Sequence, residues 1–387
     1  MDFSLSEEQQ MFRKMFDEFA RKEVARVAEH TDKAEEPPID VLRKAAAQGF
    51  LCGPIPEAYG GAGLDHVSYA MLIESIAREC LSTAIIVGMH TSLVGETILE
   101  FGTEEQKERW LPALASGESI GAFAMTEPDA GSDPSRIATR ALKEGDGYVL
   151  HGVKTWVSNG AIAGLLLVIA SSDPSANGKG LSAFVVAADA PDLKIGRREP
   201  TMGLRGLPVN TVYFDGVRVP ESDRLGEEGH GLSIGLRAVN HMRLGLGAAA
   251  LGSAEGALEL GKKFAVERKQ FGVPIATKQA LGNYFADSAA DIEALRWLVM
   301  RAAWLADQKQ DNREAASMVK LIGARVAREV ANRMLQVHGG YGFSDEYAIS
   351  KVYRDVRALD LLGGTGQIQR IVLWQSVFEG TGVHVTP

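Results

Sequence analysis

The sequence has few cysteines, fewer basic than acidic residues and no long apolar run, and each shortage argues against a class of protein. Its 387 residues include only Cys52 and Cys80, too few for a disulfide framework or a cysteine-rich metal site. Lys and Arg number 41 against 50 Asp and Glu, a formal net charge of −9, which argues against a nucleic-acid-binding protein because such proteins need a basic face. The most apolar stretch, Leu165–Ala170, is far shorter than the ~20 residues of a membrane-spanning helix.

Two further features are missing from the sequence, an export signal at the N-terminus and a metal-binding pattern among the histidines. The opening MDFSLSEEQQ has neither the basic nor the apolar segment of an export signal. The eight histidines show no metal-ligand spacing, so we predict no metal site. We therefore expect a cytoplasmic protein in a reducing compartment. The composition, 45% apolar and 24% charged, is that of an ordinary globular protein of two or three structural units.

Hydropathy patterns divide the chain into three parts. Residues 1–119 show helical periodicity, which a capping box at Ser6 and Gln9 opens. Residues 120–226 change to short apolar or alternating runs broken by Gly, Pro, Asp and Asn, which predicts a mostly antiparallel β domain. Residues 227–387 return to long helices rich in small residues. Helices, then strands, then helices indicate an α+β protein rather than a doubly wound α/β fold.

Two short motifs imitate catalytic or nucleotide-binding signatures. Gly231–Gly235 matches the G-x-S-x-G pattern of serine hydrolases, but no strand precedes it. Gly245–Ala250 is similar to a dinucleotide fingerprint, but it lies inside a helical run. We interpret both as helix sequence.

Five segments in a fixed order carry a stronger signal. They are A-M-T-E-P-D-A-G-S-D at 124–133, K-T-W-V-S-N-G at 154–160, R-K-Q-F-G at 268–272, Q-V-H-G-G-Y-G at 336–342 and G-T-G-Q-I-Q-R at 364–370. Together they resemble the motifs of the FAD-dependent acyl-CoA dehydrogenases, and the resemblance covers essentially the whole chain. It implies the acyl-CoA dehydrogenase fold, with an N-terminal α-helical domain, a central β-barrel or sandwich domain and a C-terminal four-helix bundle.

The resemblance also implies FAD and the residues that hold it. A flavin ring must be held rigidly, with fixed donors for the negative charge near N1 and O2. In isolation, Trp156 and Ser158 could be a buried core tryptophan and a turn serine. By resemblance, FAD is contacted by Phe123, Met125, Thr126, Ser132, Trp156 and Ser158, by Thr365 and Gln367, and from a neighbouring subunit by Arg268, Gln270, Phe271, Gln279, Gln336, Gly339 and Gly340.

The substrate and the partners follow from the same resemblance. It implies an acyl-CoA or acyl-carrier thioester, with Ser132, Asn240, Arg243 and Gly363 on the substrate side. It implies a homotetramer, a dimer of dimers with FAD at the subunit interface, and an electron-transfer flavoprotein as electron acceptor. Read alone, Arg243 could equally be a solvated helix arginine.

The catalytic base is where the sequence departs from the family. In most members a glutamate immediately precedes the glycine of G-T-x-x-I-Q-R, and in a minority it precedes the arginine of the long helix. These two positions are Gly363 and Met242 here, so neither carries a carboxylate. Displaced candidates for a base are Glu96, His90 and Asp360, each of which could instead have a purely structural role.

Several functions remain open without the glutamate. We predict an FAD-dependent oxidoreductase that carries out α,β-dehydrogenation, or a related unusual dehydrogenation, with a relocated base. The alternative is a base-independent elimination, as in the 3-sulfinopropionyl-CoA desulfinase branch of this fold, although the arginine expected on the pocket helix is replaced by Ile85. Less favoured alternatives are a flavin monooxygenase or nitroalkane-oxidase-like enzyme and a non-catalytic partner subunit.

Overall fold

The computed structural model describes residues 4–176 and 180–381, and its N-terminal part is helical. The capping box predicted at Ser6 and Gln9 is present at the start of the first helix. The helices of this part are α1 Glu7–Phe19, the π-helical η1 Ala20–Val24, α2 Ala28–Lys33, α3 Ile39–Ala47, η2 Glu57–Tyr59, α4 His66–Glu79, α5 Leu81–Gly88, the π-helical η3 Met89–Gly95, α6 Glu96–Phe101 and α7 Glu104–Ala115.

A mixed sheet follows and is mostly antiparallel, as predicted. Its order is β6-β7-β3-β2-β4-β5-β8, and β1 joins it by parallel pairing with β4. The strands are β1 Ile120–Ala124, β2 Arg140–Glu144, β3 Gly147–Ser158, β4 Ala163–Ser171, β5 Leu181–Ala187, β6 Leu193–Arg198, β7 Val209–Pro220 and β8 Arg224–Leu225, with single turns of helix at η4 Pro134–Arg136, η5 Gly160–Ile162, η6 Pro174–Ala176 and η7 Glu221–Asp223.

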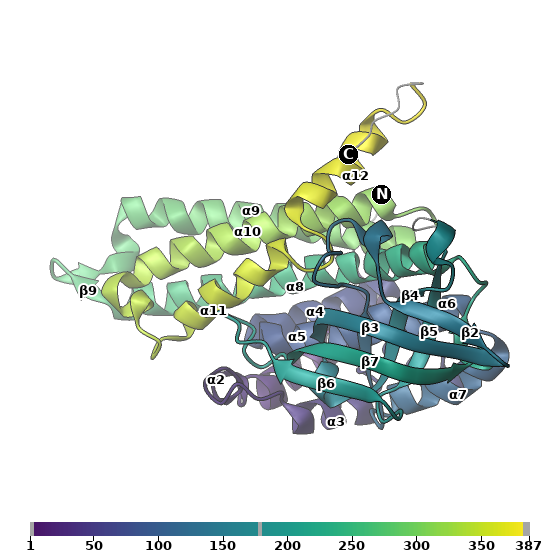
Figure 1. The fold of residues 1–387 in the computed structure, drawn as a ribbon. Helices are drawn as coiled ribbons and strands as arrows, with labels where there is room; N and C mark the ends of the chain where they lie inside the picture. Colours follow the sequence, from purple (N-terminus) through teal and green to yellow (C-terminus); the bar gives the residue numbers. More distant parts are fainter. Residues whose placement is uncertain (1–3, 177–179, 382–387) are drawn as a thin grey trace.

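The C-terminal part is built on three long helices, α8, α9 and α10. The shorter α11 packs on α8 and α10, which completes the predicted four-helix bundle, and α12 projects from the body at the top of Figure 1. The elements are α8 Gly231–Glu267, β9 Lys269–Gln270, β10 Val273–Pro274, η8 Ile275–Thr277, α9 Gln279–Asp307, α10 Arg313–His338, η9 Gly339–Phe343, α11 Ala348–Val356, η10 Arg357–Asp360 and α12 Gly366–Val377.

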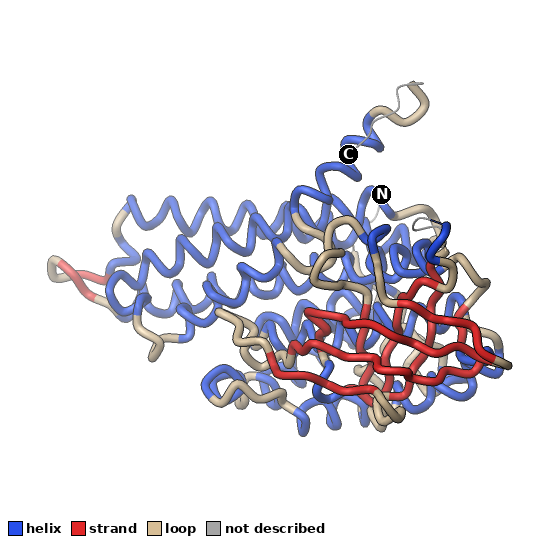
Figure 2. The backbone as a smooth tube through the Cα atoms, in the orientation of Figure 1, coloured by secondary structure: helices blue, strands red, loops and turns tan. Residues whose placement is uncertain are grey.

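Strand β4 joins the two hydrophobic cores of the molecule. Successive side chains of a strand point to opposite faces of the sheet. Leu165, Leu167 and Ile169 accordingly pack in the core shared with the helices, whereas Leu166 and Val168 pack in a second core inside the β domain. The N-terminal helices and the sheet therefore form adjacent layers beside the long bundle (Figure 2).

Close packing of α8 depends on its small residues. A Cβ atom on Gly252 would lie 2.0 Å from the Glu74 carbonyl of α4, and one on Gly247 would lie 1.8 Å from the Val319 side chain of α10. Any larger residue at these positions would push two helices apart. This explains much of the glycine content of the long helix.

The most apolar helical run is not the stretch that the sequence singled out. Leu81–Phe101, which includes α5, η3 and α6, is long and apolar enough to cross a bilayer, but 83% of its most apolar window is buried inside the protein.

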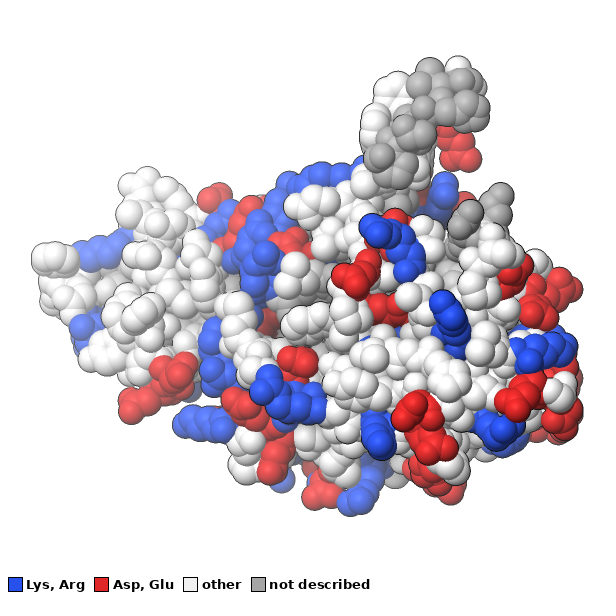
Figure 3. All heavy atoms as spheres, viewed as in Figure 1, with Lys and Arg blue, Asp and Glu red and all other residues white. Residues whose placement is uncertain are grey.

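Basic and acidic side chains are interspersed over the face drawn in Figure 3.

Candidate active site

A buried ion pair joins the first two family segments. The Lys154 ammonium lies 2.7 Å from the Glu127 carboxylate and donates to the Met125 carbonyl at 3.0 Å. Glu127 also accepts from the backbone N–H groups of Ala138 and Thr139 at 2.7 and 2.9 Å. Burial lowers the pKa of Lys154 to about 8, although the charge of Glu127 opposes this shift. The pair fixes both ends of the loop between β1 and β2.

Breaking this pair should destabilise the protein strongly. We expect Lys154→Met to lower the free energy of unfolding by about 3–5 kcal/mol, because it leaves the Glu127 carboxylate buried without its cation. Lys262→Met, which removes an exposed pair with Glu259, should cost less than about 1 kcal/mol. Urea unfolding measures both. Equal effects of the two changes would contradict a fixing role for the buried pair.

Trp156 is exposed, so the interpretation as a core tryptophan is wrong. The pairing of β3 with β7 shifts register between Lys154 and Val157, and within this bulge Trp156 has a φ of 57° and is 61% exposed. A large aromatic residue in a left-handed conformation is a strained arrangement of the kind that clusters at functional sites. The neighbouring Thr155 N–H donates to the Thr126 carbonyl at 2.9 Å, so the bulge is tied to the first family segment.

The other residues predicted around the flavin gather near this bulge, at several depths. Ser158 is buried at the end of β3, Thr126 is half-buried, and Ser132 is exposed in the loop that follows. Phe123 and Met125 come from β1 and the residue after its end. Met125 also faces α8, because its sulfur would lie 3.2 Å from a Cβ on Gly235. The residues predicted to hold the flavin ring thus lie between the β domain and the start of α8.

A second group of predicted residues lies around the far end of α8. Phe271 and Gly272 both have positive φ and form the two-residue turn of the β9–β10 hairpin, which leaves the Phe271 side chain 94% exposed. Arg268 lies over the ring of Tyr341 at 5.3 Å. A cleft of about 600 Å³ is lined here by Phe264, Arg268, Gln270, Ile275, Val337, His338, Gly339, Gly340, Tyr341, Ser344, Glu346 and Tyr347. Gln279 and Gln336 are exposed nearby on α9 and α10.

The two groups cannot meet within one chain. Helix α8 separates them by its 37 residues, a length of about 55 Å at 1.5 Å per residue. In Figure 1 the β9 hairpin is at one tip of the molecule and the sheet is at the other end. A single cofactor that uses both groups must therefore lie between two subunits.

The third group lies at the turn before α12. Thr365 caps this helix, because its hydroxyl accepts from the Ile368 N–H at 3.4 Å, and Gln367 is exposed in the first turn. Gly363 has a φ of 65°, and a Cβ atom there would lie 2.6 Å from Cδ1 of Leu246. The space in which a base would begin at position 363 is therefore filled by Leu246.

Buried cations support the backbone of this turn. Arg243 donates to the Gly363 carbonyl at 3.2 Å, and Lys320 donates to the Gly364 carbonyl at 2.5 Å. Burial lowers the pKa of Arg243 to about 10 and that of Lys320 to about 8. Neither cation has a carboxylate within 4.0 Å in the described part of the chain. Arg243 is thus not a solvated helix arginine.

All three candidate bases have close partners, and those of His90 and Asp360 leave neither residue suited to accept a proton from a substrate. His90 is fully buried: its Nδ1 accepts from the Gly121 N–H at 2.9 Å, and its Nε2 lies 3.1 Å from the Leu114 carbonyl. Burial lowers the pKa of His90 to about 4. Asp360 forms ion pairs with Arg328 and Arg357.

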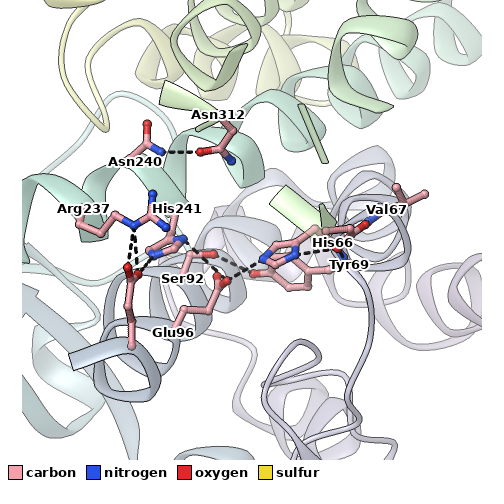
Figure 4. Close-up of polar contacts among 11 residues, drawn as sticks. His66, Val67, Tyr69, Ser92, Glu96, Arg237, Asn240, His241 and Asn312 are labelled. Carbon is pink, nitrogen blue, oxygen red and sulfur yellow. Dashed lines mark hydrogen bonds and ion pairs between the residues drawn. The ribbon is translucent and has the colours of Figure 1, made fainter. Parts of the chain in front are cut away.

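Glu96 lies among side chains that can exchange protons (Figure 4). One carboxylate oxygen is 3.0 Å from Nε2 of His66 and 3.9 Å from Nδ1 of His241. Nδ1 of His66 is 2.9 Å from the Asp307 carboxylate, and Nε2 of His241 is 2.7 Å from the Glu100 carboxylate. Each histidine thus bridges two carboxylates, and both bridges meet at Glu96.

The charges in this cluster are fixed by its contacts. Burial alone would raise the pKa of Glu96, but the hydrogen bond to His66 and the charge of His241 lower it below its ordinary value. Burial would lower the pKa of His66, but hydrogen bonds to Asp307 and Glu96 raise it to about 10. At neutral pH Glu96 is therefore a carboxylate and His66 an imidazolium.

An open space, called the void below, lies next to Gly245 of α8. Gly245 is buried in α8, yet a Cβ atom there would have no neighbour within 4 Å. One on Gly88 would meet only the end of the Met242 side chain, at 3.7 Å. On the α8 wheel, at about 100° per residue, Gly245 is about 40° from His241 and about 100° from Leu246. The void therefore opens on the α8 face between His241, which contacts Glu96, and Leu246, which lies against Gly363.

Asn240 lies near these groups and has a free acceptor. Its amide nitrogen donates to Asn312 at 2.9 Å, and its side-chain oxygen is buried without a hydrogen-bond partner among the described residues. Buried polar atoms are normally satisfied, so this oxygen is suited to a donor on a bound ligand.

Sequence reasoning missed the partners of Glu96. His66, Asp307 and His241 come from α4, α9 and α8, and 241 residues separate His66 from Asp307. No local spacing links them. In the structure, the π-helical stretch η3 lies just before Glu96, and π-bulges are frequent at functional sites, but the sequence gives no sign of it.

Comparisons with known proteins cover nearly the whole chain. The N-terminal, middle and C-terminal domain families of acyl-CoA dehydrogenases match residues 6–118, 122–217 and 229–378. An acyl-CoA dehydrogenase of Bacillus subtilis (strain 168) is 39% identical over 377 residues, which cover 97% of this chain and 100% of the relative. Butyryl-CoA dehydrogenase from Megasphaera elsdenii superposes with a TM-score of 0.96 at 33% identity, covering 98% and 100% of the two chains. PigA with FAD and proline superposes with a TM-score of 0.94 at 28% identity, covering 97% and 99%.

Proposed function

The chain belongs to the acyl-CoA dehydrogenase family, and from that premise we propose that it oxidises an acyl thioester with Glu96 as a relocated base. The family assignment makes it an FAD-dependent oxidoreductase. Neither family position of the base carries a carboxylate, whereas Glu96 is a buried carboxylate that contacts α8 at His241, on the helix face that borders the void. This last observation carries the proposal.

The residues present fit FAD. Bound FAD supplies the acceptor for the hydride that leaves the acyl group. The exposed ring of Trp156 offers an aromatic face at one end of α8, and at the other end the cleft beside Gly339 and Gly340 offers Arg268 together with backbone that a ligand can approach closely. The separation of these groups supports FAD at a subunit interface, and we propose a homotetramer, a dimer of dimers, as the assembly. We also propose an electron-transfer flavoprotein as the partner that takes up the electrons.

A substitution of Trp156 can distinguish a role in FAD binding from a role in the stability of the fold. We expect Trp156→Ala to weaken FAD binding about tenfold through lost ring contact, while the thermal unfolding of the apoprotein stays unchanged because the side chain is largely exposed. Fluorescence titration with FAD measures the affinity. Tyr213→Ala, an exposed aromatic on β7, is the control and should leave FAD binding unchanged. A loss of apoprotein stability in Trp156→Ala would instead indicate a structural role.

Activation of the thioester does not require a side chain at position 363. We propose that the Gly363 N–H still donates to the thioester carbonyl, since Arg243 and Lys320 hold the carbonyl groups of this turn on their side. The carbon acid is then activated as in the family, but its proton must go to another base. Such a base typically contributes about 10²–10⁴ in rate.

The place of Glu96 bears on which carbon loses its proton. Gly363 meets α8 at Arg243 and Leu246, whereas Glu96 meets it at His241, with the void between them. Glu96 is therefore better placed for a carbon beyond the β-carbon than for the α-carbon. Such a carbon is acidic when conjugation links it to the thioester, so we propose an α,β-unsaturated acyl group, open-chain or cyclic, as substrate.

One observation favours a second function. Near Gly363, Arg243 and Lys320 are buried cations that have no carboxylate within 4.0 Å among the described residues. They would attract an anionic substituent of the acyl group, as a base-independent elimination of the desulfinase type requires. The base-dependent oxidation remains our first proposal, because Glu96 and its histidines have no role in the elimination.

Anaerobic titration with a panel of acyl-CoA thioesters tests these functions. Loss of the oxidised flavin absorbance with an unsaturated or cyclic acyl-CoA is the result expected. Release of an anionic group from a β-substituted acyl-CoA, with the flavin left oxidised, would favour the elimination. If thioesters perturb the flavin spectrum but none reduces the flavin, the oxidation is wrong.

A further inference from the structure

Glu96 contacts two histidines, and these contacts indicate how its orientation and charge are maintained. We propose that His66, fixed by Asp307, is the positioning residue of Glu96 and keeps it ionised, with His241 as the secondary support. This inference rests on the proposed function of Glu96. It assigns a role to residues on three helices that none of the family segments contains.

Asp307 fixes the orientation of His66 through several bonds. The carboxylate is at the last residue of α9 and accepts from the backbone N–H of His66 at 2.6 Å and of Val67 at 3.3 Å, so it caps the start of α4. It also lies 2.9 Å from Nδ1 of His66. With Nδ1 held by Asp307, Nε2 points at Glu96 at 3.0 Å. The imidazole therefore donates to two carboxylates and has one favoured orientation.

His241 approaches Glu96 from the opposite side. It is on α8, its Nδ1 is 3.9 Å from the Glu96 carboxylate and its Nε2 is 2.7 Å from Glu100. Glu100 in turn pairs with Arg237 at 3.0 Å. The longer contact makes this bridge the weaker of the two.

The six side chains alternate in charge across four helices. The order is Asp307, His66, Glu96, His241, Glu100 and Arg237, so the set is neutral when both histidines are protonated. Tyr69 and Ser92 lie beside it and bond each other at 3.4 Å. No group of three or more His, Cys, Asp or Glu in the described part of the chain could hold a metal ion.

If the His66 imidazolium were removed, burial would have the larger influence on the pKa of Glu96. Burial raises the pKa of a carboxyl group, and in the native cluster His66 is the largest opposing influence. Without it, we expect the pKa of Glu96 to rise above its ordinary value. The base would then be protonated, and inactive, in weakly acidic solution.

The pH profile of His66→Gln tests this role in the FAD-loaded enzyme. Glutamine keeps a donor near the position of Nε2 but carries no charge. The rate of flavin reduction by the active thioester should match that of the native enzyme at pH 9 and fall about tenfold for each pH unit below the new pKa of Glu96. Asp307→Asn should shift the acid limb in the same direction by less. His230→Gln, which removes an exposed histidine paired with Glu227 at 3.7 Å, should leave the profile unchanged.

Stability gives a readout that does not depend on turnover. The pKa of His66 is raised on folding, so its contribution is complete below about 6.5 and is lost as the pH rises through about 10. The melting temperature of His66→Gln should therefore lie furthest below the native value near pH 6 and approach it toward pH 10.

The outcomes separate this inference from the function on which it rests. A rate lowered equally at every pH, or an unchanged acid limb, overturns the role of His66 while Glu96 remains the base. Full activity of Glu96→Gln overturns the proposed base, and the melting temperatures then decide whether His66 supports Glu96. A stability difference that does not close toward pH 10 overturns the charge-based support.

Discussion

Replacing Glu96 with glutamine should slow flavin reduction by the active acyl thioester by about 10²–10⁴, the usual contribution of a positioned general base. Glutamine has nearly the same size and can still bond His66, so the fold of the cluster is retained. The pseudo-first-order rate of anaerobic flavin bleaching in a stopped-flow instrument measures the effect. Dissociation of the thioester complex should change little, because the change removes a proton acceptor rather than a binding contact.

Glu100→Gln is the matched control for this change. Glu100 is on the same helix, one turn after Glu96, and contacts the same histidine. The Glu100 side chain is 35% exposed, against 8% for Glu96, so we expect less than a tenfold loss. Equal losses in the two variants would mean that the cluster matters for structure and that neither carboxylate is the base.

The fold could be predicted from the sequence because its signals are local and redundant. The alternation of β4 places odd and even residues in two different cores, and the small residues of α8 match its close packing against α4 and α10. The parallel pairing of β1 with β4 could not be predicted, because the two strands are 38 residues apart and no turn links them. Strand partners of this kind are determined by packing rather than by local pattern.

The site could be predicted only where a motif carries it. Glu127 and Lys154 belong to two family segments, and the structure adds that they form one buried ion pair. The support of Glu96 has no such motif. His66 meets Asp307 only because the start of α4 packs against the end of α9. Contacts between helix ends that are distant in sequence leave no periodic pattern.

A second large effect is expected from restoring a carboxylate at position 363. Gly363→Glu alone should give little activity with butyryl-CoA. The left-handed φ of 65° costs roughly 1–2 kcal/mol for a residue with a side chain, and the new Cβ would lie 2.6 Å from Cδ1 of Leu246. Leu246→Val removes both Cδ atoms and keeps branched bulk in the core. We expect the double variant to reduce its flavin with butyryl-CoA about 10²–10⁴ faster than Leu246→Val alone, since a base then stands at the family position.

Comparing Gly363→Glu with the double variant distinguishes two explanations for the glycine at position 363. Gly363 could mark a site whose acyl group has moved, or a standard site that lacks only its base. Suppose that butyryl-CoA reduces the flavin rapidly in the double variant but slowly in Gly363→Glu. The thioester then lies as in the family, and Leu246 fills the place of the base. If the double variant folds, binds FAD and butyryl-CoA, and leaves its flavin oxidised, the acyl group is directed away from position 363. The void beside Gly245 and the carboxylate of Glu96 would then define where the reacting carbon lies.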